Sequence, residues 1–129
     1  KEKGAFVLCL TSNHSSKDFQ YFNNGSEFLY ESVVKLCVDL NSSKNVGLVI
    51  GATNAIKMSS LKEISDDLAW LIPGIGAQGG DLESSIVISN RKGIGIVNVS
   101  RDILYAGKGT IKEIVESAQK YTERIRKIL

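Results

Sequence analysis

The chain has 129 residues, of which 43% are hydrophobic and 23% are charged, so it is long enough for one domain with a sizeable core. A formal net charge of +2 is too small to indicate a nucleic-acid or acidic-membrane partner. No run approaches the roughly 18 apolar residues of a membrane span, and no signal peptide is visible. We therefore expect a cytoplasmic protein that binds neither nucleic acid nor membranes.

The two cysteines agree with that compartment. Cys9 lies in an apolar run, and Cys37 lies in an apolar stretch with helical spacing. Free cysteines in such surroundings behave as small buried apolar residues, and disulfides are rare in reducing compartments. We expect both thiols to be free and buried.

Four short runs rich in Val, Ile and Leu indicate buried strands. None alternates cleanly with polar residues, which is typical of strands covered on both faces of a parallel sheet. The runs are Ala5–Leu10, Val46–Ile50, Leu68–Ile72 and Ile94–Val99. Because helical patterns follow each of them, we expect one parallel α/β domain over residues 1–129.

Each predicted strand is followed by a signal for the start of a helix. Two are capping boxes, one is an aspartate at a cap position, and one is a serine before apolar residues at helical spacing. The expected starts are Ser26, Ser60 with Glu63, Asp81, and Thr110 with Glu113.

Two architectures fit this order of elements: half of an eight-stranded barrel, or a small doubly wound sheet. The strand starts follow one another at close to the ~30-residue spacing of barrel units, which favours the half-barrel. In both architectures, ligands bind at the carboxyl ends of the strands.

The residues at those ends are rich in Gly, Ser, Thr, Asn, Gln and Arg, and contain no acid, Cys or His. The four ends are Thr11–Asn13, Gly51–Thr53, Pro73–Gly80 and Ser100–Arg101. The nearest carboxylates, Asp81 and Asp102, lie just beyond them. This composition favours a phosphorylated, hydrogen-bonding ligand over a metal ion, and no metal site is expected.

The loop Pro73–Gly80 is the strongest of these features. Its glycines allow the backbone to approach an anion closely and to donate N–H groups to it. Gln78 is its long polar side chain, and the helix expected to start at Asp81 would add a favourable dipole. The alternative is a tight strand-to-helix turn that binds no ligand.

Arg101, directly after the fourth predicted strand, is the second feature. An arginine in this position can make a bidentate contact with a phosphate. In barrels, phosphate commonly lies between the loops after strands seven and eight, which would be the loops of Gln78 and Arg101 if the four strands are numbers five to eight. The alternative is an exposed arginine paired with Asp102.

Three other features have a structural explanation. His14 is the sole histidine, follows the first strand end without Cys or acid neighbours, and is expected on the surface. Ser59-x-x-Lys62 matches a serine–lysine acylation motif, but it lies at a predicted helix start away from the strand ends. Trp70 is expected in the core.

The strand-end loops of this sequence resemble those of a known family. The segment Leu71–Asp81, LIPGIGAQGGD, is similar to the phosphate-loop signature of orotidine 5′-monophosphate decarboxylases. Flanking pieces agree in order and spacing, so the resemblance covers nearly the whole chain and is closest to the longer-chained branch of the family. The flanking pieces are FVLCLTSN at Phe6–Asn13, VGLVIGAT at Val46–Thr53, and IVNVSRDILYA at Ile96–Ala106.

The resemblance implies a (β/α)8 TIM barrel, usually a homodimer, that converts orotidine 5′-phosphate to UMP and CO2 without a cofactor. On this expectation, residues 1–129 are the carboxyl-terminal half, strands five to eight. The first and last strands of such a half would have unpaired edges. The missing strands are expected from the amino-terminal half of the same enzyme, or from a second copy in an engineered dimer.

The resemblance also implies roles for residues at the strand ends. Ser12 would hydrogen-bond the amide edge of the pyrimidine, and Pro73 would lie beside the base. Gln78 would bridge base and phosphate, and the segment Gly79–Gly80 would close over the ligand.

At the fourth strand end, the resemblance implies that the Ser100 amide and the Arg101 side chain hold the phosphate. The chain departs from the family pattern at two positions: His14 stands where many members have Pro, and Asp102 where many have Gly. The second departure is expected to make the phosphate pocket more acidic.

The family's catalytic motif, Asp-x-Lys-x-x-Asp, does not occur in the sequence. The reaction passes through a carbanion-like pyrimidine, which an ammonium group must stabilise and protonate. We therefore expect no catalytic residue in this chain and no decarboxylation by the chain alone.

Two other functions stay open. Gly74-x-Gly76-x-x-Gly79, followed by Asp102, matches the dinucleotide-binding fingerprint, although it follows the third predicted strand rather than the first. The second of these alternatives is a catalytically inert half-barrel scaffold.

Overall fold

The chain forms one four-stranded parallel sheet. A computed structural model describes residues 2–129 except 54 and 77. The strands are β1 (Ala5–Leu10), β2 (Val46–Ile50), β3 (Ala69–Ile72) and β4 (Gly95–Val97), paired in the order β1-β2-β3-β4. All four predicted strands are confirmed, with shorter bounds for the last two. Spatial order equals chain order, as in a barrel, whereas a doubly wound sheet reverses it at a switch point.

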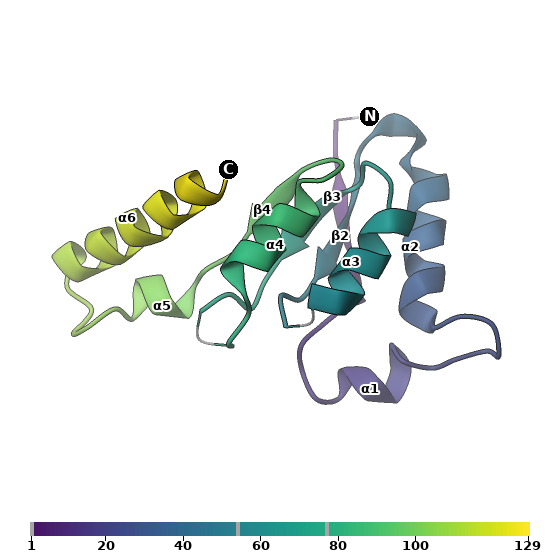
Figure 1. Ribbon diagram of the computed structural model, residues 1–129, viewed down its shortest axis with the longest axis horizontal. Coiled ribbons are helices and arrows are strands. Elements are labelled where there is room, and N and C mark those ends of the chain that lie inside the picture. The colour runs from purple at the N-terminus through teal and green to yellow at the C-terminus, as the bar shows by residue number, and fades with distance from the viewer. Residues whose placement is uncertain (1, 54, 77) are drawn as a thin grey trace.

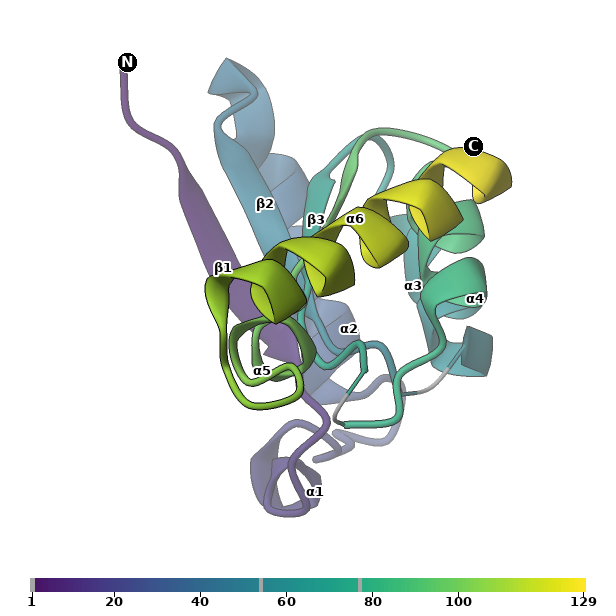
Figure 2. The same cartoon turned by 90° about the vertical axis from the view of Figure 1, so that its left-hand side faces the viewer.

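Three helices cover one face of this sheet. Figure 1 shows α2 (Leu29–Leu40), α3 (Ala55–Ile64) and α4 (Leu82–Ser89) side by side over the strands. The long helix α6 (Ile111–Ile128) packs against α4 and lies beyond β4 in Figure 1. In Figure 2, α6 lies nearest the viewer. None of the described helices is long and apolar enough to cross a membrane.

The predicted helix caps are confirmed at α4 and α6. The Asp81 carboxylate accepts hydrogen bonds from the backbone N–H groups of Glu83 and Ser84. Thr110 and Glu113 form the predicted capping box of α6. In both cases the cap is a local pattern, which is why the sequence suffices to find it.

The other two predicted helix starts are wrong. Helix α3 begins at Ala55, so Ser60 lies inside it and its hydroxyl donates to the Ile56 carbonyl instead of capping a helix. Helix α2 begins at Leu29 rather than at Ser26. The Asn24 side chain accepts from the backbone N–H of Ser26, which holds this segment in a turn before the helix.

Three short helical segments were not predicted. They are α1 (Ser16–Phe19), a 3-10 helix (Asn41–Ser43) and α5 (Arg101–Leu104). Segments of three or four residues are too short to show a helical period in the sequence.

The core lies between the sheet and the helices α2, α3 and α4. Trp70, Leu48 and Ile72 are fully buried there, as expected for Trp70. Lys62 is also buried, with its Nζ atom 3.4 Å from the Leu68 carbonyl oxygen and 4.9 Å from the centre of the Trp70 ring. Burial lowers the pKa of Lys62. Since Leu68 precedes β3, the Ser59-x-x-Lys62 motif lies away from the carboxyl ends of the strands, as predicted.

The opposite face of the sheet carries an apolar row that no helix covers fully. The pairing register aligns Leu8, Val49, Leu71 and Ile96 across the four strands. Leu8 is 61% exposed and Ile96 is 43% exposed. In a complete barrel, such a face is filled by side chains from the other strands.

Both cysteines are free and buried, as predicted. Burial raises the pKa of Cys9 to about 12 and also raises the pKa of Cys37. The reactive form of a cysteine is its thiolate, so the folded protein should protect both thiols. In the unfolded chain, a cysteine has a pKa of about 9.0. The stability that depends on keeping Cys9 in the thiol form is therefore fully present below pH 9.0 and is lost as the pH rises from there toward 12.

We predict that iodoacetamide at pH 8 leaves both thiols unmodified in the folded protein and alkylates both in guanidinium chloride. The reason is that burial holds the two groups in the thiol form. Peptide mass spectrometry would measure the modification at each cysteine. Rapid alkylation of Cys9 under folding conditions would contradict the buried position.

Candidate functional site

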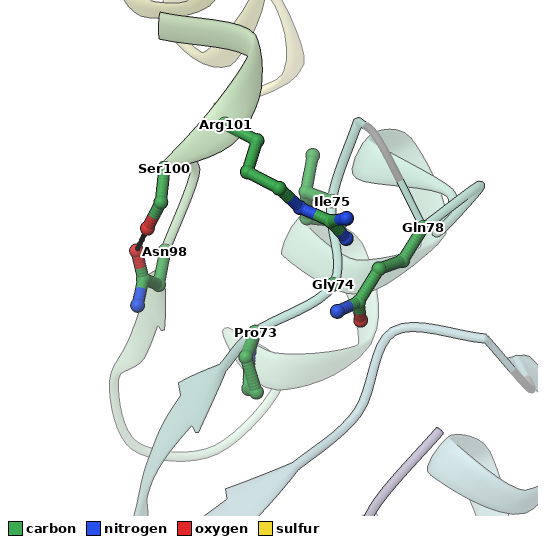
Figure 3. Close-up of a pocket in the computed structure, with 7 residues that line it drawn as sticks. All are labelled: Pro73, Gly74, Ile75, Gln78, Asn98, Ser100 and Arg101. Atoms are coloured by element: carbon green, nitrogen blue, oxygen red, sulfur yellow. Dashed lines mark hydrogen bonds between the residues drawn. The ribbon is translucent and has the colours of Figure 1, made fainter. Parts of the chain in front are cut away.

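The carboxyl ends of β3 and β4 enclose a small cavity of about 100 Å³. Most of its lining comes from the loop after β3 and from the first residues after β4 (Figure 3). The lining residues are Pro73, Gly74, Ile75, Gln78, Asn98, Ser100 and Arg101. Four of the seven predicted site residues therefore meet here, because adjacent parallel strands end at the same edge of the sheet.

Arg101 and Gln78 approach this cavity from different elements. Figure 3 shows the guanidinium of Arg101 reaching from the start of α5 toward the loop, and the carboxamide of Gln78 extending into the same space. None of the ion pairs in the described part of the chain involves Arg101. Arg101 is exposed, as that alternative expected, but it forms no ion pair with Asp102 among the described residues. The Asp102 carboxylate instead accepts a hydrogen bond from the Tyr121 hydroxyl at 2.8 Å.

The glycines of the loop are required by its backbone. Gly74, Gly76 and Gly79 have φ angles of +95°, +80° and +75°, in the left-handed region that side chains disfavour. The Gly79 N–H donates to the Gly76 carbonyl at 2.7 Å, and the Gly80 N–H donates to the Gly74 carbonyl at 3.0 Å. These two amides stabilise the turn itself. Ala77, in the same loop, lies outside the described residues.

Ser12 lies outside the cavity lining but is joined to it. Its hydroxyl donates to Oε1 of Gln78 at 3.0 Å, across 66 positions of sequence. The Gln78 side chain thus extends from the cavity near Arg101 to the carboxyl end of β1. This bond links the carboxyl ends of β1 and β3, and the same carboxamide lines the cavity that the residues after β4 complete.

Gln20 supports the end of β1 and was missed in the sequence. Its side-chain oxygen accepts from the Thr11 N–H at 2.8 Å, and its side-chain nitrogen donates to the Thr11 hydroxyl at 2.9 Å. These two bonds fix the residue that precedes Ser12. No sequence pattern marks a glutamine that follows a four-residue helix, so this contact could not be predicted.

Asn98 was also missed, although the sequence contains a signal for it. It lines the cavity, and its Oδ1 atom accepts from the Ser100 hydroxyl at 3.0 Å (Figure 3). Asn98 is a polar residue inside the apolar run Ile94–Val99, close to a strand's carboxyl end. A polar residue in that position is a useful marker of a site.

The prediction that Asp102 makes the phosphate pocket more acidic is wrong, because Asp102 lies outside that pocket. Asp102 does not line the cavity; it lines a separate hollow with Tyr121 and Arg124. His14 is exposed in the loop after β1, as predicted. Among the described residues, no group of three His, Cys, Asp or Glu side chains lies close enough to hold a metal ion. The cavity therefore offers one cation and several hydrogen-bonding groups.

Comparison with known proteins identifies the family. The profile of the Orotidine 5′-phosphate decarboxylase / HUMPS family matches residues 1–109. The chain belongs to this family.

Curated relatives named orotidine 5′-phosphate decarboxylase agree with the profile. That of Natronomonas pharaonis is 39% identical over 133 residues, covering 98% of this chain and 49% of the relative. That of an Azoarcus species is 43% identical over 111 residues, covering 84% of this chain and 41% of the relative. The chain thus spans about half the length of the curated decarboxylases that it matches.

Solved structures of a UMP synthase and of an OMP decarboxylase share the fold. Leishmania donovani UMP synthase is 37% identical with a TM-score of 0.86, and the match covers 98% of this chain and 28% of that one. Leishmania donovani OMP decarboxylase is 32% identical with a TM-score of 0.85, covering 98% and 48%. The family resemblance and the predicted barrel-type α/β fold are confirmed. The dinucleotide-binding alternative is not supported, because its glycine motif lies in the loop after β3 of a chain that belongs to the Orotidine 5′-phosphate decarboxylase / HUMPS family.

We predict that Arg101→Ala weakens binding of UMP by about 10- to 100-fold, because hydrogen bonds to charged groups contribute about 1.5–3 kcal/mol. Arg101→Lys should recover part of this loss, since a lysine keeps the charge without the planar fork. Isothermal titration calorimetry on a complete barrel that contains this chain would measure the affinity.

Arg91→Ala is the matched control, because Arg91 makes an exposed ion pair with Glu63 at 3.9 Å and such pairs contribute little. Equal UMP affinity of the Arg101→Ala variant and the parent protein would remove Arg101 from the site.

Proposed function

We propose that this chain supplies the phosphate- and pyrimidine-binding loops of an orotidine 5′-monophosphate decarboxylase. The reaction converts orotidine 5′-phosphate to UMP and CO2 in pyrimidine biosynthesis and uses no cofactor. Family membership supports the reaction, and the cavity between β3 and β4 supports the assignment of residues. The observation that carries the proposal is Gln78, whose side chain extends from the Arg101 cavity to Ser12.

Arg101 binds the phosphate group in this proposal, together with the backbone amide of Ser100. A guanidinium matches the geometry of phosphate oxygens with two parallel hydrogen bonds. The Ser100 hydroxyl is already bound by Asn98, so its contribution comes from the backbone. The freedom of Arg101 from ion pairs within the described part of the chain supports this role.

The pyrimidine lies on the Ser12 side of Gln78. A serine hydroxyl both donates and accepts, so Ser12 can meet the donor and acceptor of an amide edge while keeping its place beside Gln78. Pro73 lines the cavity without a backbone donor and packs beside the base.

Gly79 and Gly80 cover the ligand as a preformed turn. Their amides donate to the Gly76 and Gly74 carbonyls, so the segment moves as a hydrogen-bonded unit. Binding energy from the phosphate would then stabilise the closed loop and orient the substrate.

The catalytic ammonium and carboxylates come from outside this chain. The sequence contains no Asp-x-Lys-x-x-Asp motif, and no lysine or acid lines the described cavity. A carbanion-like intermediate needs a cation close to the pyrimidine carbon. A chain that matches about half of each curated relative is consistent with that division of roles.

The partner that completes the site is the amino-terminal half of the same enzyme. The apolar row of Leu8, Val49, Leu71 and Ile96 and the outer edges of β1 and β4 provide the surface for four further strands. The complete barrel is proposed to form a homodimer, as the family resemblance implies. Two free buried thiols suit the cytoplasm.

We predict that this chain alone does not decarboxylate orotidine 5′-phosphate and that activity appears when it is co-expressed with an amino-terminal half. The first choice is the part of the Natronomonas pharaonis relative that this chain does not match, since the match covers 49% of that relative. Loss of substrate absorbance and chromatography of UMP would measure the reaction.

Each half alone and the mixture with Arg101→Ala serve as controls. Full activity of the isolated chain would refute the division of roles. A complete barrel that binds UMP without decarboxylation would favour the inert scaffold.

A further inference from the structure

Asp102 follows Arg101 but makes its contacts elsewhere. Its Oδ2 atom accepts the hydrogen bond from the Tyr121 hydroxyl, and its backbone carbonyl accepts from the Ser117 hydroxyl at 2.8 Å. Both donors lie on α6. Helix α6 therefore holds the first turn of α5 at two points, one through the backbone and one through the carboxylate.

The side chains of Asp102 and Tyr121 also pack against the glycine loop, at Gly76. A Cβ atom placed on Gly76 would lie 2.3 Å from Oδ2 of Asp102 and 2.8 Å from the Tyr121 hydroxyl. A side chain at position 76 would therefore overlap Asp102 and Tyr121 in their present positions. Asp102 and Tyr121 thus lie directly on the backbone of the loop that carries Gln78.

The Tyr121 hydroxyl stays protonated near neutral pH. Partial burial, and next the hydrogen bond to the Asp102 carboxylate, raise the pKa of Tyr121, so its hydroxyl remains a donor. The guanidinium of Arg124 lies 5.7 Å from the centre of the Tyr121 ring. Lys120 and Ser117 complete the hollow that contains Asp102.

We propose that Asp102 and Tyr121 form a positioning pair that fixes the glycine loop at Gly76 against the helix turn carrying Arg101. The inference rests on the proposed function, because the spacing that it fixes is the spacing of two phosphate-binding loops. The pair also keeps the Asp102 carboxylate turned away from Arg101. Without the Tyr121 hydroxyl, that carboxylate is free to compete with phosphate for the guanidinium.

The test compares Tyr121→Phe with Tyr105→Phe in a complete barrel. Tyr105 is 75% exposed and is the matched control for loss of a tyrosine hydroxyl. Calorimetry would measure binding of UMP and of uridine, which lacks the phosphate. We expect Tyr121→Phe to weaken UMP binding about tenfold and leave uridine binding unchanged, with KM raised more than kcat is lowered.

A second variant distinguishes two causes of weaker UMP binding: a loop no longer fixed at Gly76, and an Asp102 carboxylate that competes with phosphate for Arg101. Tyr121→Phe combined with Asp102→Asn removes the charge, and we expect it to recover part of the UMP affinity. Equal weakening of UMP and uridine by Tyr121→Phe, or no weakening of UMP, would overturn the proposal.

Amide hydrogen exchange tests the pair without any ligand. The Gly79 N–H donates to the Gly76 carbonyl, so a loop released at Gly76 should exchange this amide several-fold faster in Tyr121→Phe and not in Tyr105→Phe. If the parent protein fails to bind UMP, faster exchange supports the pair while the proposed function falls. Unchanged exchange at Gly79 would overturn the pair in either case.

Discussion

The arrangement of the site depends on the parallel pairing of β3 with β4. That pairing aligns Ile72 with Val97 and brings the loop after β3 beside the turn after β4. Gln78 and Arg101 are 23 positions apart in the chain, yet both line one small cavity. A β-α-β crossover produces this proximity, since parallel strands end at one edge and the connecting helix takes up the intervening residues.

One face of the sheet forms the buried core, and the other face is apolar but partly exposed. The face under α2, α3 and α4 contains the buried core, including Trp70 and a buried lysine, Lys62. The other face has a row of apolar side chains that remain partly exposed at Leu8 and Ile96. This asymmetry fits a unit that folds around its outer helices and reaches its full core when further strands close the barrel.

Local patterns predicted most of the fold. The four strands followed from apolar runs, and the caps at Asp81 and Thr110 followed from residue types at fixed offsets. The caps proposed at Ser26 and Ser60 were wrong, because Ser60 lies inside α3 and Asn24 holds Ser26 in a turn. The hydroxyl of Ser60 donates to a carbonyl of its own helix, so a serine with a glutamate three residues later does not by itself fix where a helix begins.

The candidate site was predictable where it depends on loop composition and unpredictable where it depends on tertiary contacts. Glycines in the β3 loop and an arginine after β4 indicated a phosphate site, and Gly74 and Gln78 of that loop line one cavity with Arg101 in the structure. The supporting contacts of Gln20 with Thr11 and of Tyr121 with Asp102 join distant positions without any sequence signature. Asp102 illustrates the limit: its charge was visible in the sequence, but its direction was set by α6.

The most direct test of this account is a crystal structure of the complete barrel with UMP bound. We expect the phosphate between the β3 and β4 loops, within hydrogen-bonding distance of the Arg101 guanidinium and the Gln78 carboxamide. We expect the pyrimidine on the Ser12 side of Gln78. A phosphate bound at any other edge of the sheet, with Arg101 turned toward solvent, would contradict it.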